Sequence, residues 1–425
     1  MKKKGDTKNV PLFIGIIAAF VVLVARDVLM MDVGNGILTL IFTAIMAFLP
    51  YSSLVSFIYF MIPLTCGVPG YMMLLAIILL VVKGKSWTSK QVIPVVIVGV
   101  LEIINELGRT PDTIGVISFM SFIAVFFYLL NLNKSQVDNG QNLFCFIVGV
   151  VLTFAIIYYN MLSQYGIAGL LTGYYRSGAL GSIDNDAETM KGHLAANANT
   201  IAYYAICAVS TAIVSMKSLP YNKWLMITMT AVCFLGGVFT FSRTFILCSA
   251  LFLLLTFFFQ ERRSSVKFAV IVAAFAILAI FFYGEYINDI FSVFGGRAEE
   301  ENLSTGGGRT VLFSIYNKLW GSNIFYIVFG CGAVDYWNVL KAPNATHCGL
   351  QQIWVCLGII GLSLFVYELF SYLKRYSNKK NLIMLVPFLV SFIFDQSIQF
   401  LNPYSLLLPI LPTLIVCQLQ YQKSY

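Results

Sequence analysis

An arginine, Arg243, interrupts what would otherwise be one overlong apolar segment. It follows Ser242 and lies between the apolar runs 225–239 and 245–259. An arginine at membrane depth is costly unless it has a partner or a function, and the Ser-Arg pair indicates a turn at which a helical hairpin reverses. A planar guanidinium binds oxyanions through two parallel hydrogen bonds and keeps its charge, so Ser242 and Arg243 are candidates for binding a phosphate group. An arginine that reaches the lipid headgroups is the alternative explanation.

Two more candidate catalytic residues lie in the long segment 285–348. Arg309 follows Gly306–Gly308, and glycines at this place let backbone N–H groups approach an oxyanion. His347 comes just before the apolar run 349–373, in the first turn of a helix that we expect to enter at about Cys348. Because a helix N-terminus disfavours imidazolium, His347 is expected to be a neutral general base. These residue types could accept a proton from a hydroxyl and bind an oxyanion.

Several polar side chains are candidates for contacts with the substrate, and these are Asn197, Asn199, Asn344, Gln351 and Asp395. Asp395 shares one face of an expected helix with Gln399 and Asn402. Hydrogen bonds between helices explain Asn197, Asn199 and Asp395 equally well.

A second polar face, formed by Glu102, Glu106 and Arg109, lies at the outer end of another expected helix, and we expect an internal ion pair there. No metal or other cofactor is expected. The nine cysteines show no paired Cys-x-x-Cys spacing.

The composition predicts a membrane protein. Of the 425 residues, 59% are hydrophobic and 11% are charged, whereas charged residues make up roughly 25% of a soluble domain. Apolar runs recur from residue 10 to residue 416, which predicts one integral membrane domain covering 1–425. The net charge of +8 comes from short lysine and arginine clusters at the ends of these runs. Such clusters mark cytoplasmic loops, so no nucleic acid is expected as a partner.

The basic clusters also predict the topology. The apolar runs between successive clusters pair as 90–107 with 112–131, 142–162 with 195–216, 221–239 with 243–260, 266–284 with 349–373, and 380–397 with 402–420. The run 36–64 is interrupted at Pro50. Counted as two short helices, it gives an all-α polytopic fold of about fourteen transmembrane helices with both 1–4 and 83–90 inside. Segment 285–348 is then a large extracytoplasmic loop. If 36–64 is instead a single kinked helix, the N-terminus lies outside.

Four groups of motifs follow one another on the predicted outer face: His193 to Asn199, Ser242-Arg243, Thr305 to Arg309 with Phe329-Gly330-Cys331-Gly332, and Asn344 to His347 with Leu357-Gly358-Ile359-Ile360-Gly361. Their order resembles the superfamily of O-antigen ligases and polysaccharide repeat-unit polymerases, which are membrane glycosyltransferases of the GT-C type. The resemblance covers about residues 190–370, and Cys348 stands where the family usually has asparagine.

The resemblance implies that a sugar hydroxyl attacks the anomeric carbon of an undecaprenyl-diphosphate-linked oligosaccharide. The diphosphate then leaves, and the lipid-linked repeat units grow into a cell-surface polysaccharide outside the bacterial cytoplasmic membrane. Arg243 and Arg309 would stabilise the leaving diphosphate, and His347 would be the base. The implied partners are the lipid-linked donor and acceptor, membrane lipid and a chain-length regulator.

Two alternatives remain at this stage. A ligase would use the same site to move finished glycan onto a different acceptor, and nothing in the sequence separates it from a polymerase. A transporter or flippase of lipid-linked sugar should instead place its charged residues near the middle of the membrane, on discontinuous helices. The candidate residues gather on one predicted face, which favours an enzyme.

Overall fold

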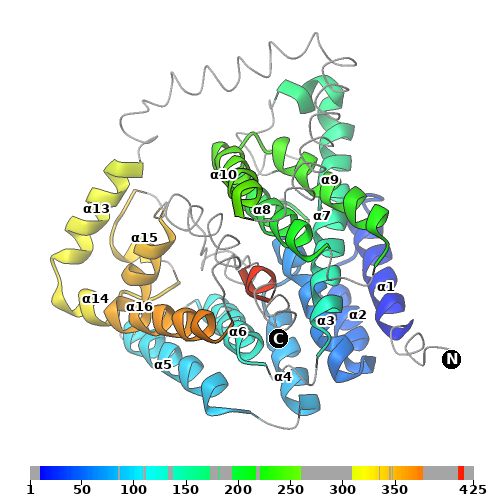
Figure 1. Ribbon diagram of the computed structural model, residues 1–425. Helices are drawn as coiled ribbons and strands as arrows, with labels where there is room; N and C mark the ends of the chain where they lie inside the picture. Colours follow the sequence, from blue (N-terminus) through cyan, green and yellow to red (C-terminus); the bar gives the residue numbers. More distant parts are fainter. Residues whose placement is uncertain are drawn as a thin grey trace.

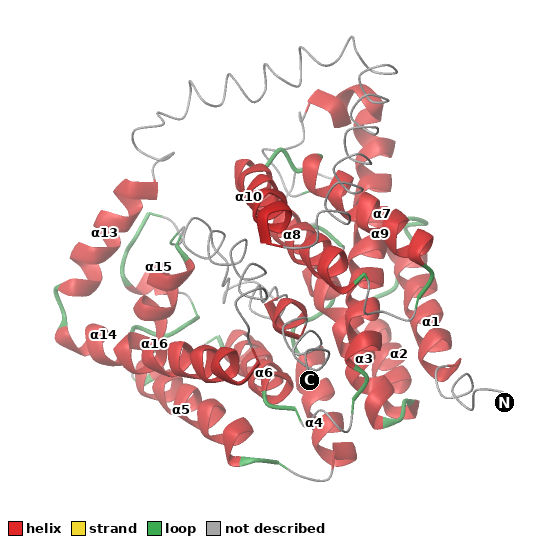
Figure 2. Ribbon diagram, viewed as in Figure 1, coloured by secondary structure: helices red, strands yellow, loops and turns green. Residues whose placement is uncertain are grey.

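The computed structural model describes residues 10–84, 87–107, 109, 112–132, 137–172, 180, 194–216, 221–259, 309–334, 336–343, 346, 348–376 and 410–415, with the side chains of 243, 255–259, 309 and 310 excepted. Within these ranges the regular structure is helical (Figure 2). One isolated antiparallel bridge joins Leu180 to Ala196. For the described residues, the prediction of an all-α fold is therefore confirmed.

The N-terminal helices are α1 (Val10–Asp27), α2 (Asn35–Phe48), α3 (Tyr51–Met61) with the short 3₁₀ helix η2 (Ile62–Cys66), and α4 (Met72–Gly84). The predicted break at Pro50 is present. Pro50 is the N-cap of α3 with an extended backbone, and a proline cannot donate the hydrogen bond that would continue α2. Lys83 at the end of α4 donates to the last carbonyls of α2, Met46 O at 3.1 Å and Ala47 O at 2.6 Å.

The central helices are α5 (Ser89–Glu106), α6 (Thr113–Leu130), α7 (Asn139–Thr172), α8 (Ala198–Ser215), α9 (Lys223–Val238) and α10 (Arg243–Phe259). Their bounds agree with the predicted runs except at the end of α7. That helix continues to Thr172 across a kink at Gly166, whose φ is 64°. Helix α7 therefore extends beyond the apolar run that was predicted to end at residue 162.

Part of the predicted extracytoplasmic loop is helical too. It contains α13 (Arg309–Gly321), α14 (Ile324–Phe329) and α15 (Tyr336–Val339), and it leads into α16 (Gly349–Tyr376). A kink at Gly358 divides α16.

The helices pack in two groups. In the first group, α1 packs against α2 and α3, and both α1 and α3 pack against α7. Helices α8 and α9 also lie against α7, and α10 packs against α8 and α9. The second contains α5, α6, α14 and α16, with α13 and α15 beside them. These groups lie at the right and left of Figure 1, and α4 joins them by packing against α2, α3 and α6.

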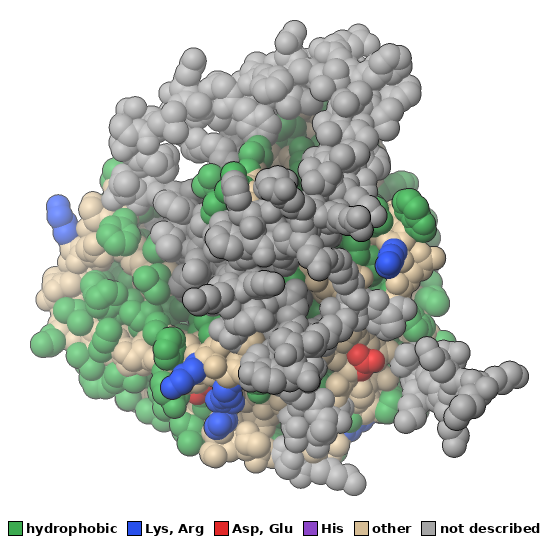
Figure 3. Space-filling view, in the orientation of Figure 1, with side chains coloured by type: hydrophobic (Ala, Val, Ile, Leu, Met, Phe, Trp, Pro, Cys, Tyr) green, Lys and Arg blue, Asp and Glu red, His purple; other side chains and the backbone are tan. Residues whose placement is uncertain are grey.

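Five of the described helices are long and apolar enough to cross a membrane: Val10–Asp27, Thr113–Leu130, Asn139–Leu171, Ala198–Ser215 and Gly349–Tyr376. Large apolar side chains are also exposed on the outside of α1, α5 and α16, for example Ile17, Ile103 and Phe370. Apolar side chains dominate the described part of the surface in Figure 3. These features indicate a membrane protein. The predicted count of about fourteen spans includes 266–284, 380–397 and most of 402–420, which lie outside the described residues.

Candidate functional site

The structure describes some of the predicted site residues and not others. His347, Asn344 and Asp395 lie outside the described residues. Arg243 and Arg309 are the first residues of α10 and α13, and only their backbone is described. Both arginines thus begin helices, where free backbone N–H groups and the helix dipole favour an anion.

The turn before Arg243 has a strained backbone. Phe241 has a φ of 49°, which is uncommon for a bulky residue without a functional or packing reason. The hydrogen bonds that hold the turn include those from Phe241 N to Val238 O at 3.0 Å and from Ser242 N to Thr240 Oγ1 at 3.2 Å. The turn predicted at the Ser-Arg pair is present in the backbone, between the end of α9 at Val238 and the start of α10 at Arg243.

Ser242 connects this turn to α8. Its Oγ donates to Asn199 Oδ1 at 3.2 Å and accepts a long hydrogen bond from Phe245 N at 3.4 Å, which caps α10. Asn197 caps α8, since its side chain accepts from Asn199 N at 2.9 Å. The N-termini of α8 and α10 therefore lie together. The contact between helices that was the alternative for Asn199 is present, and a substrate contact of Asn197 or Asn199 stays a prediction.

A second contact joins α13 to α16. Gln351 Nε2 donates to Phe313 O and to Asn317 Oδ1, each at 3.0 Å. The two hydrogens of this amide are thus engaged inside the protein, so the predicted substrate contact of Gln351 would have to use Oε1.

The backbone on both sides of His347 is held in place. Thr346 N donates to the Tyr336 hydroxyl at 2.9 Å, and Gln352 Nε2 approaches the same oxygen at 3.4 Å. Cys348 O accepts from Gln352 N at 2.9 Å, which starts α16. Tyr336 is fully buried. The side chains of Tyr336 and Gln352 thus fix the entry into α16, where the general base is predicted.

Two glycine-containing segments, 330–332 and 355–358, contact each other through backbone hydrogen bonds. Cys331 N donates to Val355 O at 2.9 Å and Gly332 N to Cys356 O at 3.0 Å, at the point where Gly358 kinks α16. Gly330 and Gly358 have φ of 83° and 64°. A Cβ on Gly330 would lie 2.1 Å from Cys356 O, and a Cβ on Gly358 would lie 2.1 Å from Val328 O. Only glycine fits at both places.

Polar residues at the C-terminal end of α5, and Arg109 just after it, contact this segment. Glu102 accepts from Ala333 N at 3.1 and 3.0 Å, Asn105 Nδ2 donates to Phe329 O at 3.0 Å, and Arg109 donates to Cys331 O at 2.8 Å. The expected internal ion pair on this face is not found among the described residues, where the only salt bridge is Arg26–Asp27. The reason is that backbone groups of residues 329–333, which would otherwise lack a hydrogen-bond partner, bind these side chains instead.

Cys331 lies within this segment, and burial raises the pKa of its thiol to about 12. It is protonated near neutral pH, so it is not suited to act as a nucleophile.

Sequence reasoning missed a buried ion pair at the end of α1. Arg26 binds Asp27 at 2.8 and 2.9 Å and donates to Gly67 O at 2.8 Å. Two adjacent charged residues at the end of an apolar run were the available signal. Each charge is neutralised within the protein, which indicates that the pair fastens α1 to η2.

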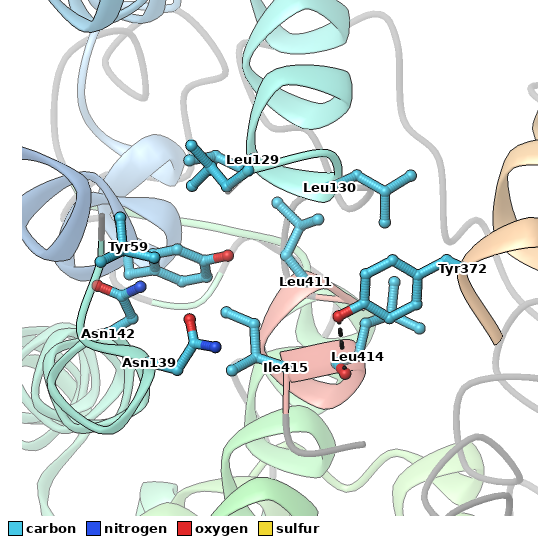
Figure 4. A pocket seen from close by; sticks show the side chains of 11 residues that line it. Tyr59, Leu129, Leu130, Asn139, Asn142, Tyr372, Leu411, Leu414 and Ile415 are labelled. Atoms are coloured by element: carbon cyan, nitrogen blue, oxygen red, sulfur yellow. Dashed lines mark hydrogen bonds between the residues drawn. The ribbon is translucent and has the colours of Figure 1, made fainter. Parts of the chain in front are cut away.

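A small pocket lies at the N-terminal end of α7, where α6, α7, α16 and the segment 410–415 meet. Figure 4 shows its lining, which includes Tyr59, Asn139 and Asn142, and the hydrogen bond from Tyr372 to Leu414 O at 3.1 Å. Its volume of about 10 Å³ has room for one water molecule. It cannot hold a sugar, and it does not include any of the candidate residues.

Comparisons with protein-family models and with curated proteins found no match for this sequence.

Proposed function

We propose that the protein is a metal-independent glycosyltransferase of the membrane. It would polymerise undecaprenyl-diphosphate-linked oligosaccharide repeat units into a cell-surface polysaccharide. The reaction would take place on the outer side of the bacterial cytoplasmic membrane, with His347 as general base and Arg243 and Arg309 on the leaving diphosphate.

The observation that supports this proposal most directly is the contact between Gln351 and Phe313. Gln351 lies four residues after His347, and Phe313 lies four residues after Arg309. Four residues are about one helical turn. A base that precedes one helix in the sequence and a cation that begins a neighbouring helix suit a reaction in which a hydroxyl loses a proton while a diphosphate gains charge.

The second support comes from Asn199 and Ser242. Their contact brings the N-terminus of α8 beside that of α10, which starts at Arg243. Two helix N-termini and an arginine form an environment that favours a polyanion such as a diphosphate.

The proposal is tested with purified protein in lipid nanodiscs and a synthetic lipid-linked repeat unit, with and without a chelator. A ladder of lengthening lipid-linked glycans is expected under both conditions. Transfer only to an added, chemically different acceptor would indicate a ligase instead. Movement of the lipid-linked unit across the bilayer without a new glycosidic bond would indicate a flippase. Loss of the ladder with chelator, restored by a divalent cation, would contradict the metal-independent mechanism.

A further inference from the structure

Two polar residues of α5, and a third just after its end, contact the segment that leads to the predicted base. Glu102, Asn105 and Arg109 bind the backbone of residues 329–333, more than 200 positions away in the sequence. We call these three residues the α5 clamp.

The α5 clamp supplies hydrogen-bond partners to backbone groups at and after the end of α14. Residues 330–333 lie between α14 and α15 and belong to neither helix. Buried backbone N–H and C=O groups outside regular structure need other partners. Glu102 supplies an acceptor for Ala333 N, while Asn105 and Arg109 supply donors for the carbonyls of Phe329 and Cys331.

The burial of the clamp argues against an incidental contact. The Glu102 side chain is 1% exposed and that of Asn105 is 3% exposed. Buried polar and ionisable groups in a membrane helix are costly, and hydrogen bonds to fixed partners reduce that cost. Gly332 allows the close approach, since a Cβ there would lie 3.3 Å from Glu106 and 3.5 Å from Arg109.

A short path connects the clamp to His347. Ala333 is three residues before Tyr336 in the sequence. The Tyr336 hydroxyl accepts from the backbone N–H of Thr346, which is bonded to His347. The clamped segment also donates to Val355 O and Cys356 O of α16, the helix that His347 precedes.

We propose that Glu102, Asn105 and Arg109 are positioning residues, which set the place of His347 through Ala333, Tyr336 and Thr346. This inference rests on the proposed function, because it assumes that His347 is the base. None of the three touches the reacting atoms, so their removal should slow turnover and leave the affinity for the donor unchanged.

The first experiment measures the clamp without reference to activity. Amide hydrogen exchange is compared for the full-length wild-type protein, Glu102→Ala, Glu102→Gln and Glu106→Ala, all in nanodiscs. Glu102→Ala should speed exchange in peptides covering 329–346 by at least about tenfold, with α1 to α4 unchanged. Glu102→Gln keeps an acceptor oxygen and should restore most of the protection. Glu106 is the matched control: this carboxylate, one turn further along α5, lies near Gly332 but forms none of the hydrogen bonds that define the clamp.

The second experiment measures kcat and donor KM for the same proteins. Glu102→Ala should lower kcat by up to about 100-fold, as expected when a reacting group is misplaced by about an ångström. KM should stay within about twofold of wild type, with recovery of kcat in Glu102→Gln. Asn105→Ala and Arg109→Ala should behave like Glu102→Ala, and they test the inference if Glu102→Ala does not fold.

The outcomes separate the two proposals. Unchanged exchange at 329–346 in Glu102→Ala, or equal effects of Glu102→Ala and Glu106→Ala, would overturn the clamp. Faster exchange with normal kcat would overturn its role in positioning His347. A wild-type protein that forms no glycosidic bond would overturn the proposed function, while the exchange experiment would still decide whether the clamp exists.

Discussion

Gln351 Nε2 donates to Phe313 O at 3.0 Å, and this hydrogen bond joins the first turn of α16 to the second turn of α13. Arg309 begins one of these helices and His347 lies two residues before the other in the sequence, so the contact couples the two ends at which the chemistry is predicted. Asn317 Oδ1 accepts the second hydrogen of the same amide. The contact between the two helices therefore uses both N–H hydrogens of the Gln351 side-chain amide.

Replacing Gln351 should weaken this coupling. Gln351→Ala removes both hydrogen bonds, so we expect a loss of about 1–2 kcal/mol in stability and a fall in kcat of about tenfold. Thermal unfolding in detergent and single-turnover kinetics measure the two effects. Leu350→Ala is the control, because the neighbouring Leu350 is partly exposed and makes no such contact. Equal losses in both variants would mean that the start of α16 is merely sensitive to truncation.

The His347→Ala variant should fold and insert normally, since one side chain outside the hydrophobic core contributes little to the stability of a protein of this size. Chain extension should nevertheless fall by about 10²–10⁴-fold, the usual contribution of general-base catalysis. Donor binding should survive, because the arginines and the lipid tail supply it. Donor affinity is measured by microscale thermophoresis and turnover by gel analysis of the glycan. Full-length polymer from this variant would remove His347 as the base.

The arginines should show a different pattern from the histidine. Arg309→Ala should weaken donor binding as well as turnover, since its predicted ligand is the diphosphate. Arg243→Lys should also be impaired, because an ammonium cannot reproduce the two parallel hydrogen bonds of a guanidinium. Titration with a lipid diphosphate, compared with the same lipid carrying a single phosphate, measures the effect. An Arg243→Lys protein that binds both lipids like wild type would show that only charge matters there.

Gly358→Ala should be strongly destabilising. The residue has a φ of 64°, and a Cβ would lie 2.1 Å from Val328 O. Backbone would have to move, at a cost of roughly 3 kcal/mol or more. Gly36→Ala is the matched control, because a Cβ on Gly36 in α2 would meet nothing within 4 Å. Denaturant unfolding should therefore shift for Gly358→Ala alone. A normal unfolding midpoint for that variant would mean that α16 can straighten at little cost.

The sidedness of the chain is also testable. Lys134, Lys217, Arg262 and Lys379 should be cytoplasmic, and the 285–347 segment should be outside, because the basic clusters share one side. Single cysteines in a cysteine-free background are labelled in intact cells with an impermeant maleimide. Labelling should occur at position 300 and be absent at position 262. The reverse pattern would invert the topology and place every candidate residue on the wrong side.

Local features were predictable from the sequence alone. The helices α5, α6, α9 and α10 lie within about two residues of the predicted apolar runs, since an apolar run bounded by polar residues contains the information for its own helix. The break between α2 and α3 follows in the same way from Pro50, which removes a backbone donor. Arg243 and Arg309 at helix starts were also foreseeable, because a turn and a glycine cluster precede them.

The partners of the polar residues were decided by tertiary structure. Glu102 was expected to pair with a nearby arginine, yet it binds Ala333 N, 231 positions away. Asn199 and Ser242, Gln351 and Phe313, and Gly330 and Gly358 likewise meet only because separate helices pack side by side. A one-dimensional pattern shows that a group is polar and where it lies on its helix. It does not show which other helix will be its neighbour, because that choice depends on the packing of all the apolar faces together.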